Sequence, residues 1–576
     1  MKKTRVQVFS IVALLFMCFI IYKLMDIQLI STENYGDKQV NLLEESVEQR
    51  TTEIELSSGR GILLDRNKQP LNNDVKKDIV LFPFIQNIEI PSSIQSDLTE
   101  FYNSWEQSLK RNNNPVYLSD LANKDIPNTL YDKISQSKIP GIIAVERTLS
   151  NDPSIAAHVQ GLVRSNDDEF KKRYHDSMHS ETSQPIGISG LEKTFDSFLI
   201  SENDQKLLYH VDAKGDPLLG LDLRYIGKGD AFYPTNIKTT IDLSMQETVE
   251  KIVDEHGIKK GGVVLLDTET NEVLSLASRP KINKEDPYKN NSTKNQMLTT
   301  QFPGSVFKTV VAAAALENIP ESINTTYNCN LDLYGEEAGE RQLGILTFDE
   351  SFAQSCNYTF ATIAKQLVEN NQTILEDYAK KLGLLGPVGW SGDLYHFKNF
   401  SQLPEEEVGR VWGNSHDPFV AKAIAQTGIG QKEVKVTPLA VANMISTIVN
   451  NGVNREIKVV DEILYNNDTT MYKFDSKHSE DGINKETALK LKQLLTDVVD
   501  EGTGYKLKGL GVAGKSGTAQ IGKETRYNHW FAGYFPKDAP KYAMVVVDLN
   551  QTSEHAKTYP VYKDIVTGIS EQKGLH

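Results

Sequence analysis

Cysteine is scarce in this sequence: the 576 residues include three, Cys18, Cys329 and Cys356. Three cysteines do not form a disulfide framework of the kind that stabilises small secreted domains. Cys18 lies in an apolar N-terminal run, and Cys356 lies inside the tripeptide S-C-N. Because a disulfide bond at Cys356 would constrain its two polar neighbours, we expect Cys329 and Cys356 to be free thiols, although an oxidising exterior would permit a bridge.

An excess of basic residues is also lacking, since the formal net charge is -15. Binding to nucleic acid requires clusters of cations that neutralise phosphates, so this charge excludes a nucleic-acid partner. No low-complexity tract or fixed-period repeat interrupts the chain, and 39% of the residues are hydrophobic. A globular protein is therefore expected, and its length predicts two or more domains.

A long hydrophobic run is present at the N-terminus. Lys2, Lys3 and Arg5 precede the apolar stretch 6–22, which residues 24–30 extend. Seventeen helical residues span about 26 Å, close to the hydrocarbon core of about 30 Å. A cleaved signal peptide is the alternative, but no A-x-A-like site follows the run, which favours an uncleaved anchor. The preceding cations predict a cytoplasmic N-terminus, with residues beyond about 30 outside the cytoplasm.

The sequence from about residue 40 to 240 is polar and mixed, and it contains no convergent polar cluster that suggests chemistry. In the stretch R-G-I-L-L-D-R-N at 60–67, we expect the arginine and aspartate to form a structural ion pair at a turn. His158 is expected to be a packed or capping histidine, because no second metal-binding residue type lies at helical spacing from it. No metal site is predicted.

The hydrophobic periodicity changes after residue 240. Two branched apolar runs, 261–267 and 272–277, are separated by a short polar turn and predict a β-hairpin. Two further strands are expected at 529–535 and 542–549, followed by a closing helix at about 561–572. Strands at both ends of a largely helical segment predict an α+β fold, with helices packed on one antiparallel sheet.

The first candidate for chemistry is S-V-F-K at 305–308, in an expected helix start that follows Pro303 and Gly304. Ser305 lies in the first turn, and Lys308 projects from the same face three residues later. A serine hydroxyl needs an adjacent base, and a desolvated lysine beside another cation can serve as one. Taken alone, a serine and a lysine at this spacing on a helix usually carry no function.

The second candidate is S-C-N at 355–357, in a stretch with a helical pattern. Ser355 offers a hydroxyl for proton relay, and Asn357 offers an amide that can orient a peptide carbonyl. A simple helix cap is the structural alternative for this tripeptide.

The third candidate is K-S-G-T at 515–518, which is expected on a strand. Lys515 and the hydroxyls of Ser516 and Thr518 can hold a carboxylate, and Gly517 allows a substrate backbone to approach closely. A plain edge strand with a solvated lysine is the alternative for this motif.

The three motifs, in this order, resemble the set found in penicillin-binding proteins and class A β-lactamases. Over nearly its whole length the chain is similar to class B penicillin-binding proteins, the monofunctional peptidoglycan D,D-transpeptidases. The stretches at 60–67, 190–192, 240–242 and 436–440 also match. Ser516 stands where threonine is usual and keeps the hydroxyl, while Lys68 and Gln296 replace the usual glycine and arginine.

The resemblance implies three segments: a cytoplasmic stub and signal anchor at 1–30, a pedestal or dimerisation-type domain at 31–240, and a transpeptidase domain at 241–576 with a serine β-lactamase-like fold. It also implies the roles of the motif residues. Ser305, activated by Lys308, attacks the D-Ala-D-Ala bond of a peptidoglycan stem peptide, and Ser355 passes a proton to the leaving D-Ala. Lys515 is the fourth implied catalytic residue and helps to hold the terminal carboxylate, and the implied substrate-binding residues are Asn357, Ser516, Gly517 and Thr518.

No metal or organic cofactor is implied by the resemblance. The implied ligands are stem peptides and β-lactam antibiotics, and a polytopic glycan polymerase is the implied partner of the anchor and pedestal. The implied location is the cell membrane, with one span and an extracytoplasmic catalytic domain.

Other activities compete with cross-linking. A β-lactamase is disfavoured by the anchor and the long region that precedes the motifs. A D,D-carboxypeptidase shares the motifs and differs only in its acceptor, and a non-catalytic scaffold or a β-lactam sensor is the alternative from another class of protein. The motifs do not distinguish roles in elongation, division, sporulation or backup.

Overall fold

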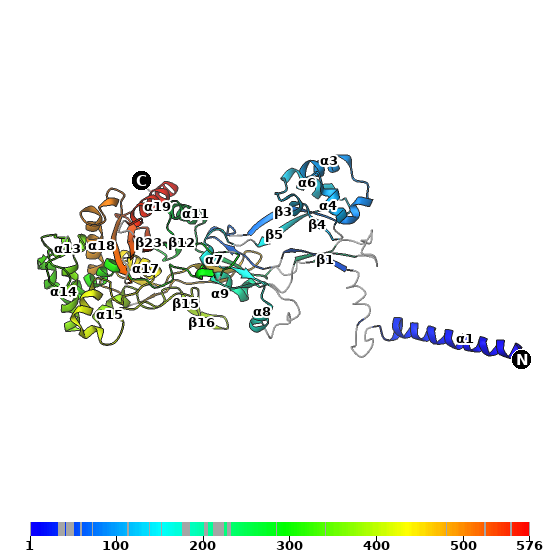
Figure 1. Ribbon diagram of the computed structural model, residues 1–576, viewed down its shortest axis with the longest axis horizontal. Helices are drawn as coiled ribbons and strands as arrows, with labels where there is room; N and C mark the ends of the chain where they lie inside the picture. The colour runs from blue at the N-terminus through cyan, green and yellow to red at the C-terminus, as the bar shows by residue number, and fades with distance from the viewer. Residues whose placement is uncertain are drawn as a thin grey trace. The chain divides into compact units, whose positions relative to one another are not determined.

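The structure is a computed structural model of the 576-residue chain. It describes residues 2–32, 41, 51–57, 60–71, 73–111, 114–137, 139–150, 153–174, 185–200, 205–210, 224–226, 232–283, 285–287, 289–339, 341–479, 481–522, 526–552 and 556–574. Contacts divide the chain into two compact units (Figure 1). The first comprises 1–60, 74–149 and 201–229, and the second comprises 61–73, 150–200 and 230–576.

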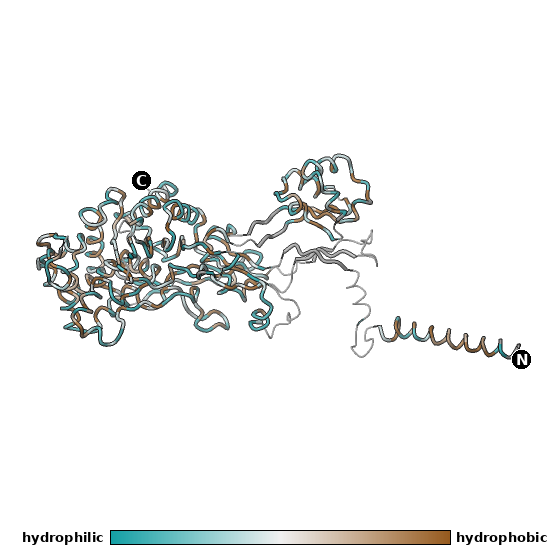
Figure 2. Tube along the Cα trace, in the orientation of Figure 1, coloured by the Kyte–Doolittle hydropathy of each residue, from teal (hydrophilic) through white to brown (hydrophobic). Residues whose placement is uncertain are grey.

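The N-terminal run forms helix α1 (Lys2–Met25), which continues as a π-helical turn, η1 (Asp26–Ile30). Residues 7–30 are long and apolar enough to cross a membrane, and none of the most apolar stretch is buried inside the protein. Figure 2 shows the helix as an almost continuous hydrophobic rod. Apolar side chains left in water are costly, so the helix fits the expected membrane anchor.

The first unit also contains two three-stranded sheets and a small helical core. The sheets are β1-β8-β9 and β4-β3-β5. Ile79, Leu98, Trp105, Leu118 and Ile134 are buried together where the helices meet the second sheet. The elements are β1 (Thr51–Ser57), β3 (Asn73–Leu81), η2 (Pro83–Asn87), α3 (Ser92–Phe101), α4 (Trp105–Arg111), β4 (Val116–Tyr117), α5 (Leu118–Ala122), α6 (Asn128–Ser137), β5 (Ile142–Ser150), β8 (Gln205–His210) and β9 (Arg224–Ile226).

Residues 150–200 belong to the second unit, together with residues 61–73 and 230–576. Residues 150–200 form α7 (Ala157–Gln160), β6 (Val163–Arg164), α8 (Asp167–Arg173), β7 (Ile186–Gly187), α9 (Gly190–Thr194) and α10 (Asp196–Leu199). A four-stranded sheet lies in the same unit, in the order β19 (Thr470–Lys473), β18 (Val460–Leu464), β10 (Asn236–Thr239), β2 (Leu63–Leu64). Phe195 connects residues 150–200 to later parts of the unit, because its ring packs edge to face with the rings of Phe400 and Phe474.

Two structural expectations fall in this region. The carboxylate of Asp65 accepts hydrogen bonds from the backbone N–H groups of Asn67 (2.7 Å) and Gln69 (2.8 Å). The Asp65 carboxylate therefore closes a turn. An ion pair with arginine was expected there, but these backbone donors lie nearer to the carboxylate than any guanidinium does. His158 is 8% exposed and lies 3.0 Å from the carbonyl oxygen of Ser292, as expected for a packed histidine.

The main sheet of the second unit is assembled from both ends of residues 241–576, as the strand pattern predicted. Its order is β12 (Val273–Arg279), β11 (Gly261–Asp267), β23 (Tyr542–Gln551), β22 (Arg526–Phe535), β21 (Ala513–Ile521), and every neighbouring pair is antiparallel. The chain is therefore α+β. Alternate residues of β23 face two cores: Val546 packs in the core with α11 (Leu243–Glu255) and α19 (Thr558–Lys573), and Val545 packs in the core with α17 (Pro438–Val449).

On the face where α17 lies, α17 packs against β11, β22 and β23, and α18 (Lys485–Asp500) packs against β21. Beyond them, α12 (Lys308–Asn318) packs against α14 (Asn357–Asn370), α15 (Ile374–Lys381) and α18. The remaining helices are α13 (Phe348–Ala353) and α16 (Ala421–Gly428). Short elements connect them: η3 (Lys289–Asn291), η4 (Gly304–Phe307), η5 (Pro320–Asn324), β13 (Tyr327–Asn328), β14 (Ile345–Leu346), β15 (Ser391–Leu394), β16 (Phe397–Ser401), η6 (Asp417–Phe419), β17 (Asn454–Arg455), β20 (His478–Ser479) and η7 (Tyr505–Leu507).

Candidate active site

Ser305 lies in the 3-10 turn η4, which leads directly into α12, so the expected helix start is present. The turn is held against the edge of the main sheet. Gly304 has φ +53°, and a Cβ there would lie 2.5 Å from the carbonyl oxygen of Thr518 on β21. The indole N–H of Trp530 on β22 donates to the carbonyl of Phe302 (2.9 Å). Close backbone approach thus places the Ser305 hydroxyl beside the K-S-G-T strand.

Lys308 is fully buried at the first position of α12. Its Nζ donates to the carbonyl oxygen of Ser355 (2.8 Å), the hydroxyl of Ser355 (3.1 Å) and the side-chain oxygen of Asn357 (2.7 Å). Among the hydrogen bonds of these described residues, none joins Lys308 to the Ser305 hydroxyl. The first and second motifs therefore meet through the lysine.

Burial lowers the pKa of Lys308 well below its usual value, and the charges of Lys515 and Arg341 lower it further. Lys515 is also fully buried, and its pKa falls to about 7 for the same reason, with a smaller effect from Arg341. Removing a lysine from water disfavours its charged form, and nearby cations add to that effect. The site therefore makes the neutral form of Lys308 more accessible than it is for a lysine in water, and a base must be neutral before it takes a proton.

The S-C-N segment lies at a break between two helices. Helix α13 ends at Ala353 and α14 begins at Asn357, while Ser355 between them has φ +57°. Helical pattern continues on both sides, but the left-handed Ser355 turns the chain, and this turn presents both its carbonyl and its hydroxyl to Lys308. The expected helical pattern is confirmed on both sides of the turn, and Cys356 is the N-cap residue of α14.

Cys329 and Cys356 are joined by a disulfide bond, with their Cα atoms 5.9 Å apart. The expectation of two free thiols was wrong. Cys329 follows β13, and the β13–β14 hairpin folds over the α13–α14 break, which brings the two cysteines within the usual range for a bridge. That approach depends on tertiary contacts, which the spacing of the cysteines does not reveal.

The K-S-G-T segment lies on β21, as expected. The Lys515 Nζ donates to the carbonyl oxygen of Ser516 (3.1 Å), and the hydroxyls of Ser516 and Thr503 lie 2.7 Å apart. Gly517 packs closely on the Ser305 turn, because a Cβ there would lie 2.5 Å from the carbonyl oxygen of Pro303. Gly517 therefore allows close packing of the strand on the turn, in addition to any close approach of a substrate backbone.

A cavity of about 410 Å³ brings the three motifs together. Six of the eight predicted site residues line it, namely Ser305, Ser355, Asn357, Ser516, Gly517 and Thr518. Lys308 and Lys515 are buried and contact this lining through hydrogen bonds to Ser355, Asn357 and Ser516. The geometry offers a serine hydroxyl, a buried amine of lowered pKa and a set of hydrogen-bonding groups in one place.

Sequence reasoning missed other residues that line this cavity. They are Arg341, Ile429, Gln431, Thr503, Trp530, Ala556 and Tyr559. Arg341 is the single charged residue among the lining residues that the structure describes. None of these residues belongs to a motif, and they come from five separate stretches of chain, so no local pattern could have identified them.

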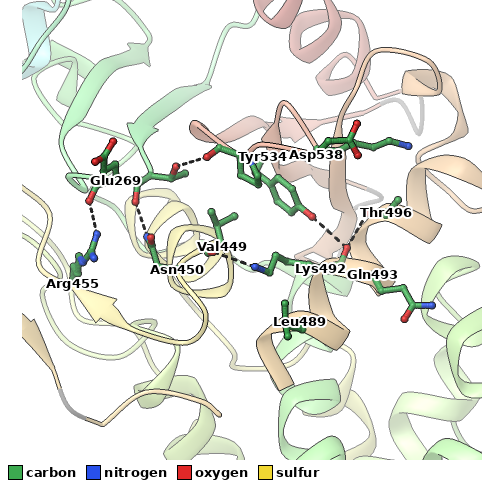
Figure 3. Close-up of a pocket in the computed structure, with 13 residues that line it drawn as sticks. Glu269, Val449, Asn450, Arg455, Leu489, Lys492, Gln493, Thr496, Tyr534 and Asp538 are labelled. Atoms are coloured by element: carbon green, nitrogen blue, oxygen red, sulfur yellow. Dashed lines mark hydrogen bonds between the residues drawn. The ribbon is translucent and has the colours of Figure 1, made fainter. Parts of the chain in front are cut away.

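A larger cavity, of about 500 Å³, lies elsewhere in the second unit (Figure 3). The Lys492 Nζ there donates to the carbonyl oxygen of Val449 (3.3 Å), and Asn450 donates to the carbonyl oxygen of Thr268 (2.6 Å). None of the predicted site residues lines it. In the described part of the chain, no group of three metal-ligating side chains is suited to hold an ion, and the expectation that no cofactor is required stays a prediction.

Comparison with known families finds two matches along the chain. Residues 261–567 match the penicillin binding protein transpeptidase domain, and residues 55–224 match the penicillin-binding protein dimerisation domain. The first match alone covers more than half of the chain and contains all eight predicted site residues.

Curated relatives are similar over much of their length. The peptidoglycan D,D-transpeptidase PbpA of Mycobacterium tuberculosis is 26% identical over 378 residues, which cover 58% of this chain and 72% of that protein. Stage V sporulation protein D of Bacillus subtilis is 26% identical, covering 89% of this chain and 77% of that protein. The peptidoglycan D,D-transpeptidase FtsI of Escherichia coli is 24% identical, with coverages of 86% and 79%.

A solved structure shares the fold over 99% of both chains, with a TM-score of 0.65 and 20% sequence identity. That structure concerns the structural coordination of polymerization and crosslinking by a peptidoglycan synthase complex.

Proposed function

The chain belongs to the class B penicillin-binding proteins, and from that premise we propose that Ser305 is the nucleophile of its acyl-transfer reaction. The protein is a peptidoglycan D,D-transpeptidase, a serine acyl transferase. The observation that carries the assignment of residues is the meeting of three distant motifs in one cavity, with Lys308 donating to Ser355 and Asn357.

In the first step, the Ser305 Oγ attacks the carbonyl carbon of the penultimate D-Ala, and its proton passes to the neutral Lys308 amine. The peptide bond to the terminal D-Ala breaks, and that nitrogen leaves as an amine with a proton delivered through Ser355. The lowered pKa of Lys308 supports its role as base, and its hydrogen bond to Ser355 supports the relay. Backbone N–H groups of Ser305 and Thr518 stabilise the oxyanion.

In the second step, an amine of a neighbouring stem peptide attacks the ester carbonyl. A new amide bond forms, the bond to the Ser305 Oγ breaks, and the oxygen regains a proton. Asn357 orients the peptide. During the first step, before the terminal D-Ala leaves, Lys515, Ser516 and Thr518 hold its carboxylate. The lining of the cavity by Asn357, Ser516 and Thr518 supports these binding roles.

Benzylpenicillin tests the nucleophile, because it acylates an activated serine and forms a stable adduct. Intact-protein mass spectrometry of the wild type is expected to show one covalent adduct, and peptide mapping is expected to place it on Ser305. Ser305→Ala is expected to remove it. An adduct of equal yield on Ser305→Ala would refute the assignment.

A D,D-carboxypeptidase would use the same residues and transfer the acyl group to water. Incubation with a pentapeptide donor and an amine acceptor separates the two activities: cross-linked dimer indicates transfer to amine, and tetrapeptide alone indicates hydrolysis. The non-catalytic scaffold predicts that Ser305→Ala complements a deletion strain fully, whereas the enzyme predicts that it does not.

The N-terminal charges support one orientation in the membrane. Lys2, Lys3 and Arg5 precede the apolar helix and support a cytoplasmic N-terminus and an extracytoplasmic catalytic unit.

A polytopic glycan polymerase is the proposed partner of the anchor and the dimerisation domain. The likeness in fold to a chain from a peptidoglycan synthase complex supports this partner. Co-purification from membranes with and without residues 1–30 tests the anchor's contribution.

A further inference from the structure

Arg341 is the charged residue of the cavity that belongs to none of the three motifs. It lies between strands β13 and β14, it is exposed, and it lines the same cavity as Ser305, Ser355 and Asn357. One of its terminal nitrogens, Nη2, donates to the carbonyl oxygen of Gln354. A guanidinium has five N–H donors, so most of them are left for a ligand in the cavity.

The segment that carries Arg341 is fixed to the second motif. The disulfide bond joins Cys329, at the start of this segment, to Cys356, between Ser355 and Asn357. Within the segment, the N–H of Gly344 donates to the side-chain oxygen of Asn330 (2.8 Å), and the N–H of Cys329 donates to the carbonyl oxygen of Gly344 (2.8 Å). Arg341 is therefore held by both ends of its segment beside the residues proposed to contact substrate.

The charges around the cavity are uncompensated. The charge of Arg341 lowers the pKa of both Lys308 and Lys515, and no ion pair between described residues includes any of the three. The terminal carboxylate of a D-Ala-D-Ala peptide, held by Lys515, supplies one negative charge. Arg341 comes from a different element than Lys515, so it is available for a second anion.

We propose that Arg341 binds a second carboxylate of the stem peptide, on a residue other than the terminal D-Ala, and so makes the enzyme selective for stem peptides that carry this carboxylate in its free, unamidated form. The inference rests on the proposed function of the same cavity. Arginine suits this role because its planar fork can donate two parallel hydrogen bonds to a carboxylate, which an amide group cannot accept in the same way.

The test compares two synthetic peptides that end in D-Ala-D-Ala and differ only in one inner carboxylate, which is free in one and amidated in the other. Release of D-Ala and formation of cross-linked product are measured for each with the full-length protein in detergent. For the wild type we expect kcat/KM to be about 10- to 100-fold higher with the free acid, the range given by a hydrogen bond to a charged group.

Arg341→Gln is expected to remove the preference by raising KM for the free acid, while values for the amidated peptide change little. Arg341→Lys keeps the charge and is expected to restore part of the preference. Lys422→Gln, on an exposed lysine of α16 that does not line the cavity, is the matched control and keeps the wild-type ratio.

Equal kcat/KM for both peptides with the wild type would overturn the inference, and this comparison requires no variant to fold. The inference would also be overturned if Arg341→Gln kept the preference for the free-acid peptide, even if the pH profile of acylation changed. Labelling with benzylpenicillin distinguishes failure of the proposed function from failure of the role of Arg341. Absence of the adduct on Ser305 in the wild type would contradict the proposed function. Normal labelling without a preference between the two peptides would contradict the role of Arg341 alone.

Discussion

The Nζ of Lys308 donates to the hydroxyl of Ser355 at 3.1 Å, although 47 residues separate the two in sequence. The same amine donates to the backbone carbonyl of Ser355, which holds the residue at φ +57° in the break between α13 and α14. One buried lysine thus fixes the conformation of the second motif and links it to the first. This relationship gives the site a structural requirement for Lys308 in addition to its proposed role as base.

Lys308→Met is expected to slow acylation by benzylpenicillin by about 10²- to 10⁴-fold, the range for loss of a general base. Stopped-time labelling followed by intact mass measures the rate. Lys251→Met replaces an exposed lysine of α11 and is expected to acylate at the wild-type rate. Near-normal labelling of a folded Lys308→Met protein would remove the lysine from the mechanism.

The pH dependence of acylation is expected to have two limbs. The rate rises with pH as Lys308 loses its proton, because only the neutral amine can accept the proton of Ser305. It falls above about pH 7, where Lys515, with its pKa lowered to about 7, loses the charge that attracts the substrate carboxylate. The second-order rate constant of acylation, measured between pH 5 and pH 9, reports both limbs in the free enzyme.

Lys515→Arg provides the matched variant for this profile. Arginine stays protonated throughout the range, so the falling limb is expected to disappear while the rising limb stays. Retention of the fall in a correctly folded Lys515→Arg protein would assign that limb to another group.

Gly304→Ala is expected to disrupt the turn that carries Ser305. Its φ of +53° disfavours any side chain, at a cost of about 1–3 kcal/mol, and the added Cβ would lie 2.5 Å from the carbonyl oxygen of Thr518. Gly511→Ala imposes a similar φ, +64°, with no atom within 4 Å of the added carbon, so it isolates the cost of conformation. Thermal midpoints and benzylpenicillin rates are expected to fall further for Gly304→Ala, and equal losses would show that the contact with β21 is unimportant.

Removal of the disulfide bond is expected to destabilise the catalytic unit. Cys329 and Cys356 are 27 residues apart, and opening a loop of that length costs about 3.5 kcal/mol in the chain-entropy account. The variant Cys329→Ser with Cys356→Ser is expected to have a lower thermal midpoint and slower acylation than Cys18→Ser, which alters the free thiol of α1. Thiol titration of the unreduced protein would contradict the bridge if it counted three reactive cysteines after unfolding.

The sequence by itself determined the elements that depend on local pattern. The alternating and branched apolar runs of β11, β22 and β23 predicted strands, and these strands form one antiparallel sheet from both ends of the catalytic region. The apolar run at the N-terminus predicted α1 in the same way. Three motifs also predicted eight site residues, because a serine, an amine and carboxylate-binding groups are what acyl transfer requires, and their roles stay a prediction.

Only the tertiary structure decided the features that depend on contacts between distant segments. The break at Ser355 follows from a lysine of another helix, and the Cys329–Cys356 bond follows from the fold of the β13–β14 hairpin. Arg341 enters the cavity on the same hairpin, and residues 150–200 join the catalytic unit through aromatic contacts such as Phe195 with Phe474. Local periodicity reports the burial of one face of one element, whereas these features are set by which elements meet.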